Sequence, residues 1–280
     1  MKLYKNQQTA YLEIANTWFQ QADNDWNQLI NRTNLYHFLK EDLKNWTRLK
    51  TAPVLGMDAP IDQQEVWAAG VTYLRSKVAR MEESKKAGGG DFYDKVYDAD
   101  RPELFFKATA ARTVGHGDRV FIRRDSLWNV PEPELTLFCS SAGTIEGYTI
   151  GNDMSSRSIE GENPLYLPQA KTYERSAALG PCILVLEKPI PKSTTIEMEI
   201  FRDGQQLYTD RVAIQQIKRS LTELVDYLFK ECNFPYGCFL MTGTCLVPPD
   251  DFTLELGDEI RIRISGIGEL VSFVGMRGIL

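Results

Sequence analysis

Three carboxylates in a short stretch have the types and spacing of an oxygen-ligand metal site. Glu132 and Glu134 stand two residues apart in VPEPELTLF, and Asp153 follows in GYTIGNDMSSR. Alternate side chains of a strand share a face, roughly 7 Å apart, so the two glutamates would repel each other. A divalent cation offsets that repulsion, and carboxylate ligands favour Mg²⁺, Mn²⁺ or Ca²⁺ over Zn²⁺. A solvent-facing acidic strand edge is the alternative interpretation.

The elements that must position these carboxylates are short β-type runs, which dominate from about residue 104 onward. Turns rich in Gly, Pro, Asp and Ser separate them, and FRDGQQL carries an Asp-Gly hairpin signal. One helix is predicted over residues 217–232, from apolar residues on one stripe. The pattern predicts an α+β fold. The predicted strands are LFFKAT, DRVFIRR, ELTLFCS, IEGYTIGND, PCILVLE, TIEMEIFRDGQQLYTD, TCLVP and EIRIRISGIGELVSFV.

The first fifty residues are predicted to be helical and poor in strands. Leu35, Leu39 and Leu43 recur at the spacing of a helix. TAPVLGMDAP contains two prolines and a glycine and is interpreted as a linker. Two domains are therefore expected: a small N-terminal domain over 1–60 and a catalytic domain over 61–280.

The segment between linker and strands begins with a predicted strand from Val66 to Tyr73. It then becomes charged and helical and reaches Gly88-Gly89-Gly90. Three consecutive glycines destabilise a helix or strand, because glycine loses more conformational freedom on folding than other residues. They predict either a loose surface loop or a hinged lid over the site.

Composition narrows the classes of partner. The net charge of −6 favours neither nucleic acid nor an anionic membrane, and no apolar run approaches the ~20 residues of a membrane span. Five cysteines without CxxC spacing indicate reduced thiols in a cytoplasmic protein. With two histidines in all, a His-rich zinc site or a Ser-His-Asp triad is not expected.

Four motifs together resemble the fumarylacetoacetate hydrolase family over roughly residues 66 to 280. They are PEPEL (131–135), GYTIGNDMSSR (147–157), QAKTYERSAALGP (169–181) and Thr-Gly-Thr (242–244). The resemblance implies a mixed β-sheet roll or barrel and a homo-oligomer, dimer or tetramer. It also implies an Mg²⁺ or Mn²⁺ site, with Ca²⁺ an option in a crystal, made by Glu132, Glu134 and Asp153.

Residues 95–118 and 162–181 look like the 2-keto-3-deoxy-D-arabinonate dehydratase branch of that family. That branch removes water from a 2-keto-3-deoxy sugar acid and yields 2-oxoglutarate semialdehyde. Hydrolases of the family carry a segment like Asn-Tyr-x-x-His-x-x-Glu, whose His-Glu pair activates water. Here Tyr73 matches, but Ser76 and Ala79 stand at the His and Glu positions. This departure favours the dehydratase.

Dehydration requires a base near C3 and an acid near the C4 oxygen. Lys171, which the resemblance places against the metal, is the candidate base if burial and the metal's charge lower its pKa. Its alternative role is a cation that holds substrate oxygens. Glu103 in RPELFFKAT is the candidate acid, the alternative being a surface carboxylate paired with Arg101 or Lys107.

Further residues are candidates for binding the substrate rather than for proton transfer. Thr244 and the Gly243 backbone suit a carboxylate, and Arg157 suits either the substrate or an ion pair with a metal ligand. The remaining candidates are Lys107, Tyr73 and Arg75.

The predicted function is an Mg²⁺-dependent hydro-lyase acting on a 2-keto-3-deoxy sugar acid, most simply the five-carbon acid of pentose catabolism. A C–C bond hydrolase of acylpyruvates or diketo acids is one alternative. A non-catalytic keto-acid-binding protein is the other.

Overall fold

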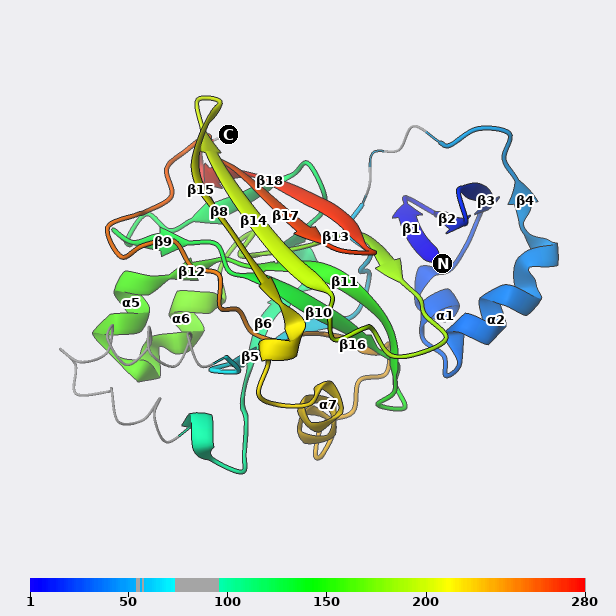
Figure 1. Cartoon of the computed structure of the whole chain (residues 1–280), viewed down its shortest axis with the longest axis horizontal. Helices are drawn as coiled ribbons and strands as arrows, with labels where there is room; N and C mark the ends of the chain where they lie inside the picture. The colour runs from blue at the N-terminus through cyan, green and yellow to red at the C-terminus, as the bar shows by residue number, and fades with distance from the viewer. Residues whose placement is uncertain (54–55, 57, 74–95, 280) are drawn as a thin grey trace.

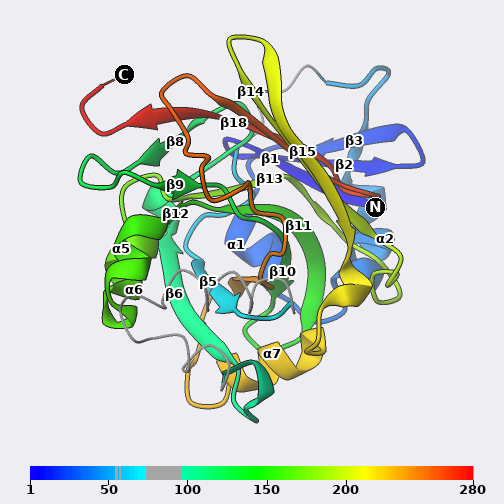
Figure 2. The same ribbon diagram turned by 60° about the vertical axis from the view of Figure 1, so that its left-hand side comes forward.

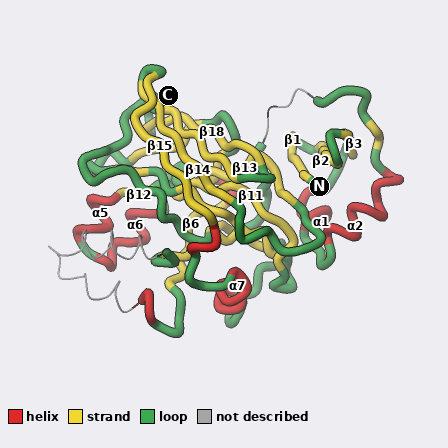
Figure 3. Tube along the Cα trace, in the orientation of Figure 1, coloured by secondary structure: helices red, strands yellow, loops and turns green. Residues whose placement is uncertain are grey.

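The computed structural model describes residues 1–53, 56, 58–73 and 96–279. Strands dominate its centre, while short helices lie at the periphery (Figures 1 and 3). The fold is α+β and sheet-dominated, as predicted. The triple glycine and the charged segment before it fall outside the described residues.

The larger sheet of the described residues holds eleven strands and runs the length of the molecule. Its path is β4-β3-β2-β1-β13-β11-β10-β16-β5-β6, with β7 (Thr113–Val114) paired to β13. From β1 to the end of this path, the strands are β13 (Ala177–Leu184), β11 (Ile145–Asp153), β10 (Pro133–Cys139), β16 (Cys238–Met241), β5 (Glu65–Gly70) and β6 (Glu103–Thr109). These strands curve around the molecule's interior (Figure 2).

A second sheet covers the concave side, in the order β15-β14-β17-β18-β8. Its strands are β15 (Gln205–Ala213), β14 (Thr195–Arg202), β17 (Glu259–Ile264), β18 (Gly268–Met276) and β8 (Arg119–Ile122). β14 and β15 form the predicted hairpin, since Asp203 and Gly204 both take positive φ between them. Alternate residues of β14 and β17 are buried, which packs this sheet onto the larger one.

Short elements frame one end of the larger sheet. β9 (Asn129–Val130) pairs with β12 (Ser155–Ser156), and α5 (Arg157–Glu162) and α6 (Leu167–Lys171) follow. The predicted helix over 217–232 is α7 (Leu221–Leu228), shorter because Ser220 caps its N-terminus by accepting a hydrogen bond from the Glu223 N–H.

The prediction that the first fifty residues are strand-poor is wrong. They contain β1 (Lys2–Asn6), β2 (Thr9–Ile14), β3 (Thr17–Gln21) and β4 (Thr47–Arg48), besides α1 (Trp26–Ile30) and α2 (Leu35–Asp42). Hairpin turns with positive φ at Gln7, Ala15 and Asn16 join the strands. The predicted helix residues Leu35 and Leu39 are buried on α2, as expected.

The N-terminal strands extend the larger sheet, because β1 pairs with β13 in antiparallel register. Figure 1 shows this segment to one side of the main body. The division at residue 60 stays a prediction.

Two further predicted strands need correction. TCLVP is not a strand; the preceding Cys238–Met241 is, because it pairs with both β10 and β5. β5 ends at Gly70 rather than at Tyr73, because Val71 takes a left-handed φ of +52°. Among the described residues, no helix is long and apolar enough to span a membrane.

Burial of the β1 side chains is expected to stabilise the whole chain. Leu3 is fully buried in an apolar cluster with Ile183 and Phe138 of the larger sheet. Leu3→Ala should therefore lower the free energy of unfolding by about 2–5 kcal/mol. Leu207→Ala, where the side chain is 41% exposed, is the control and should change it by less than about 0.5 kcal/mol. Urea denaturation measures both; equal effects would contradict this packing.

Candidate active site

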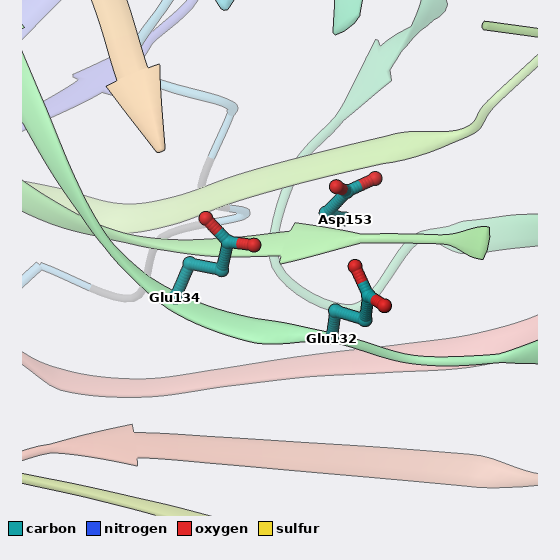
Figure 4. Close-up of side chains that lie close together, drawn as sticks. All are labelled: Glu132, Glu134 and Asp153. Carbon is teal, nitrogen blue, oxygen red and sulfur yellow. The ribbon is translucent and has the colours of Figure 1, made fainter. Parts of the chain in front are cut away.

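The three predicted metal ligands meet at one end of the larger sheet. Glu132 immediately precedes β10, Glu134 lies on it, and Asp153 ends the neighbouring β11. The Asp153 N–H donates to the Glu132 carbonyl at 2.9 Å, which fixes the two strand ends side by side. One oxygen from each carboxylate lies within 4.8 Å of the others, and all three side chains are buried (Figure 4).

Glycines opposite the glutamates leave room on this face of the sheet. Glu134 is paired across the sheet with Gly151, and Glu103 with Gly70. A Cβ on Gly70 would lie 2.0 Å from Glu103 Oε2. The Glu103 carboxylate therefore lies directly over the Gly70 backbone.

Glu103 and Glu134 project from the same face of the sheet. Phe138, four residues after Glu134 on β10, belongs to the apolar cluster that includes Ala68. Phe105, two residues after Glu103 on β6, packs against that same cluster. Because alternate strand residues share a face, both glutamates lie on the side of that cluster.

Lys171, the last residue of α6, contacts two of the three predicted ligands. Its Nζ donates to Glu132 Oε2, to Asp153 Oδ2 at 3.0 Å and to Ser155 Oγ at 2.5 Å. The lysine is fully buried. It is thus placed beside the carboxylates, as the resemblance implied, and not on the surface.

Lys107 lies on the other side of Asp153, also fully buried. Its Nζ is 2.6 Å from Asp153 Oδ1 and donates to the Met154 carbonyl at 2.8 Å and to the Lys171 carbonyl. These three contacts match the three N–H bonds of an ammonium group. Lys107 holds a predicted ligand and the end of α6 in fixed positions.

Arg157 supplies the third cation, since its Nη2 donates to Glu132 Oε1 at 2.5 Å. Three carboxylates and three cations therefore balance formally. A divalent cation added to this set leaves a net positive charge, which favours an anionic ligand such as a keto acid.

Burial shifts the pKa values of groups in this cluster. Desolvation raises the pKa of the Glu134 carboxyl well above its usual range, and the negative charges of Asp153 and Glu132 raise it further. Desolvation likewise lowers the pKa of Lys107, against the opposing effect of Asp153. A carboxylate buried beside two others is stabilised by a cation, so the residues present fit a hard divalent ion.

A small cavity of about 20 Å³ adjoins the carboxylates. Its polar walls include Arg157, Lys171 and Thr244, and its apolar walls include Val71 and Phe105. A larger cavity of about 680 Å³ lies elsewhere, beside the first turn of α7. Only the small cavity adjoins the three-carboxylate cluster, which is the one such group among the described residues, so we place the chemistry there.

The other predicted binding residues do not all lie at the cavity. Thr244 lines the cavity, while the Gly243 N–H donates to Glu134 Oε2 at 2.6 Å and thereby orients that carboxylate. Tyr73 is buried in the apolar core near Glu134, and burial raises its pKa. Arg75, like Ser76 and Ala79, lies outside the described residues.

Sequence reasoning missed several residues of this site, among them Ser155, Phe105 and Val71. Ser155 stands in the same GYTIGNDMSSR motif as Asp153, and that motif could have indicated it. Phe105 lies with its ring centroid 5.7 Å from Lys171 Nζ. Neither it nor Val71 carries a signal in the sequence beyond its apolar character.

The buried carboxylate site and the mixed, curved sheet together define a class of protein. Comparison with known protein families identifies that class. Residues 65–274 match the family described as fumarylacetoacetate (FAA) hydrolase C-terminal. The chain belongs to that family, which confirms the resemblance of its motifs.

Relatives in the family narrow the class further. The chain is 50% identical over 216 residues to a probable 2-keto-3-deoxyxylonate dehydratase of Haloferax volcanii, covering 77% of this chain and 73% of the relative. It is 43% identical over 220 residues to the 2-dehydro-3-deoxy-D-arabinonate dehydratase of Saccharolobus solfataricus, covering 78% and 74%. A solved 2-keto-3-deoxy-D-arabinonate dehydratase, complexed with magnesium and 2,5-dioxopentanoate, aligns over 99% of both chains with a TM-score of 0.83 and 35% identity.

Removing one predicted ligand charge should weaken metal binding. Glu134→Gln keeps an oxygen for the Gly243 N–H but loses the negative charge, so the affinity for Mg²⁺ should fall at least about 10-fold. Titration calorimetry with MgCl₂ measures the affinity. Glu162→Gln, at an exposed position on α5, is the matched control and should bind Mg²⁺ like the wild type. Unchanged affinity in Glu134→Gln would exclude this carboxylate as a ligand.

Proposed function

We propose that this protein is an Mg²⁺-dependent dehydratase of a 2-keto-3-deoxy sugar acid. The substrate we favour is 2-keto-3-deoxyarabinonate, converted to 2-oxoglutarate semialdehyde and water. The observation that carries the proposal is the buried Lys171 amine in contact with Glu132 and Asp153. The group that we propose as the base therefore lies beside the oxygens that would hold the ion.

Glu132, Glu134 and Asp153 would hold the ion, which supplies a Lewis acid for the carboxylate and ketone oxygens of a 2-keto acid. Arg157 and the Gly243 N–H orient two of these carboxylates. Held in this way, the three carboxylates keep one oxygen each within 4.8 Å of the others, close enough for one ion to contact all three.

Lys171 is proposed to take a proton from C3. Its Nζ contacts the carboxylates of Glu132 and Asp153 on one side and Ser155 Oγ on another, which fixes where the amine points. In its neutral form it accepts the proton; in its charged form it holds substrate oxygens. Ser155 is proposed to keep the amine oriented in both states.

Glu103 is proposed to protonate the departing C4 hydroxyl. It lies over Gly70, which lines the cavity, on the same face of the sheet as Glu134. Loss of the C3 proton and the C4 hydroxyl releases one water. A proton shift from C5 to C3 then gives an enol between C4 and C5. Transfer of the enol's hydroxyl proton to C4 gives the C5 aldehyde, which balances the reaction.

Lys107 is proposed to be a positioning residue rather than a contact of the substrate. Its three contacts go to Asp153, the Met154 carbonyl and the Lys171 carbonyl. Thr244 and Arg157 line the cavity and are proposed to contact the substrate carboxylate and hydroxyls. Tyr73, Gly243 and Arg75 stay predicted binding residues.

We also propose that the protein is cytoplasmic and homo-oligomeric. All five cysteines are free thiols, and four of them are buried, which suits a reducing compartment. The oligomer rests on the family resemblance alone.

Activity should depend on the metal and on Lys171. With Mg²⁺ and 2-keto-3-deoxyarabinonate the protein should release an aldehyde, measured with a hydrazine reagent, and EDTA should stop the release until Mg²⁺ is restored. Lys171→Met should lower kcat by about 10²–10⁴-fold, the usual contribution of acid–base catalysis. Lys218→Met, a partly exposed lysine bonded to Asp98, is the control. Release of pyruvate from an acylpyruvate instead would favour a hydrolase.

The close approach of Glu103 to Gly70 gives a test of the proposed acid. Gly70→Ala should displace the Glu103 carboxylate and lower kcat about as much as Glu103→Gln does, roughly 10²-fold. The thermal midpoint should change little, because the displaced group is the end of a flexible side chain. Gly56→Ala, with open space around its Cβ position, is the control. Multiplicative losses in the Gly70→Ala/Glu103→Gln double variant would contradict a shared role.

A further inference from the structure

Val71 has a backbone conformation that a β-branched residue rarely adopts. Its φ is +52°, in the left-handed region where Cβ crowds the following carbonyl. Seven other non-glycine residues of the described chain have positive φ, and they lie at exposed or half-buried turns. Val71 alone among them is buried, with 5% of its surface exposed. It is also the only one with a branched Cβ.

The residues on either side of Val71 hold the site together. Gly70 lies beneath the Glu103 carboxylate. The Thr72 hydroxyl donates to the Thr242 carbonyl at 2.7 Å, and its oxygen fills the space where Gly243 would carry a Cβ, 2.0 Å away. The left-handed turn at Val71 ends β5 between these two contacts.

Glycine would fit this turn without strain, yet the chain has valine. Val71 belongs to neither of the two apolar clusters of the described residues, although it is buried. It lines the cavity beside the carboxylates, together with Phe105. A strained residue at such a place points to a function of its side chain.

The position of Val71 indicates which part of a substrate it faces. In the proposed function, the ion held by the carboxylates would bind the end of the keto acid that carries C1 and C2. Glu103 lies over the residue just before Val71, which itself lines the cavity. C3 lies between the ketone and the C4 hydroxyl. Resting on the proposed function, we infer that Val71 is a specificity-determining residue whose apolar side chain selects keto acids without a hydroxyl at C3.

The selection follows from desolvation. A C3 hydroxyl placed against the valine methyl groups loses its water and gains no hydrogen bond. An apolar contact of this kind discriminates by about 10- to 200-fold. The 3-deoxy acid, with a methylene at C3, meets no such cost.

Pyruvate and hydroxypyruvate are a matched pair of probes, since they differ only by the hydroxyl at C3. Titration calorimetry of the Mg²⁺-loaded wild type should give pyruvate an affinity at least about 10-fold higher than that of hydroxypyruvate. Val71→Thr keeps the shape and replaces one methyl group with a hydroxyl, so it should bring the two affinities within about 3-fold of each other. An unchanged preference in Val71→Thr would overturn the inference.

The backbone strain at Val71 can be tested by thermal unfolding, without a ligand. At an ordinary strand position alanine is more stabilising than glycine, but at a left-handed residue the order reverses. Val71→Gly should therefore unfold at a higher temperature than Val71→Ala, and the reverse order would contradict the backbone conformation on which the inference depends.

The two measurements also separate this inference from the proposed function. If the wild type binds both keto acids equally while it dehydrates 2-keto-3-deoxyarabinonate, the role of Val71 is wrong and the proposed function stands. If neither keto acid binds the Mg²⁺-loaded wild type, both are contradicted, whatever the order of the thermal midpoints.

Discussion

The mutual repulsion of three buried carboxylates is the constraint on which the rest of this structure depends. Transferring one ion from water into a protein interior costs several kcal/mol, and like charges side by side add to that cost. Two lysines and an arginine from three separate elements, β6, α5 and α6, offset it by contacting Asp153 and Glu132 directly. The long connection from β11 to β13 therefore has a physical purpose, because it carries Arg157, Ser155 and Lys171 back to the end of β11.

One face of the larger sheet carries both an apolar packing surface and the candidate active site. A glycine lies opposite Glu134 in the part of the sheet that forms the site. Along β10, Phe138 packs against Phe239 of β16, with ring centroids 5.2 Å apart. Toward the other end of that strand, Glu134 lies opposite Gly151, where a Cβ would lie 2.3 Å from Thr136 Oγ1. The missing side chain at Gly151 leaves this space to the Thr136 hydroxyl, and the ladder of backbone hydrogen bonds continues past it.

The carboxylate cluster could be predicted from the sequence better than its surroundings. Two glutamates with strand spacing and a third carboxylate on the next β-type run predicted the group that the structure brings together, because residue type and spacing are local properties. The N-terminal strands were not predicted, because the helical spacing of Leu35 and Leu39 was taken to represent all of the first fifty residues. The residues before them form hairpins instead, with turns that have positive φ at Gln7 and Asn16. Their attachment to the sheet is the pairing of β1 with β13, in which Lys2 lies opposite Leu184, and no local pattern reveals so distant a partner.

The conformation of Val71 also depends on distant residues and could not be predicted from the local sequence. A valine in VWAAGVTY extends a predicted strand by its propensity, yet contacts made by Gly70 and Thr72 with distant residues hold it in a left-handed turn. Such a conformation costs a non-glycine residue of order 1–3 kcal/mol and persists only where the surroundings over-determine it. Here the surroundings are Glu103 and the Thr242–Gly243 turn, which belong to the site itself. The contacts that place the proposed acid and the Glu134 carboxylate thus lie on either side of Val71 and hold it beside the cavity.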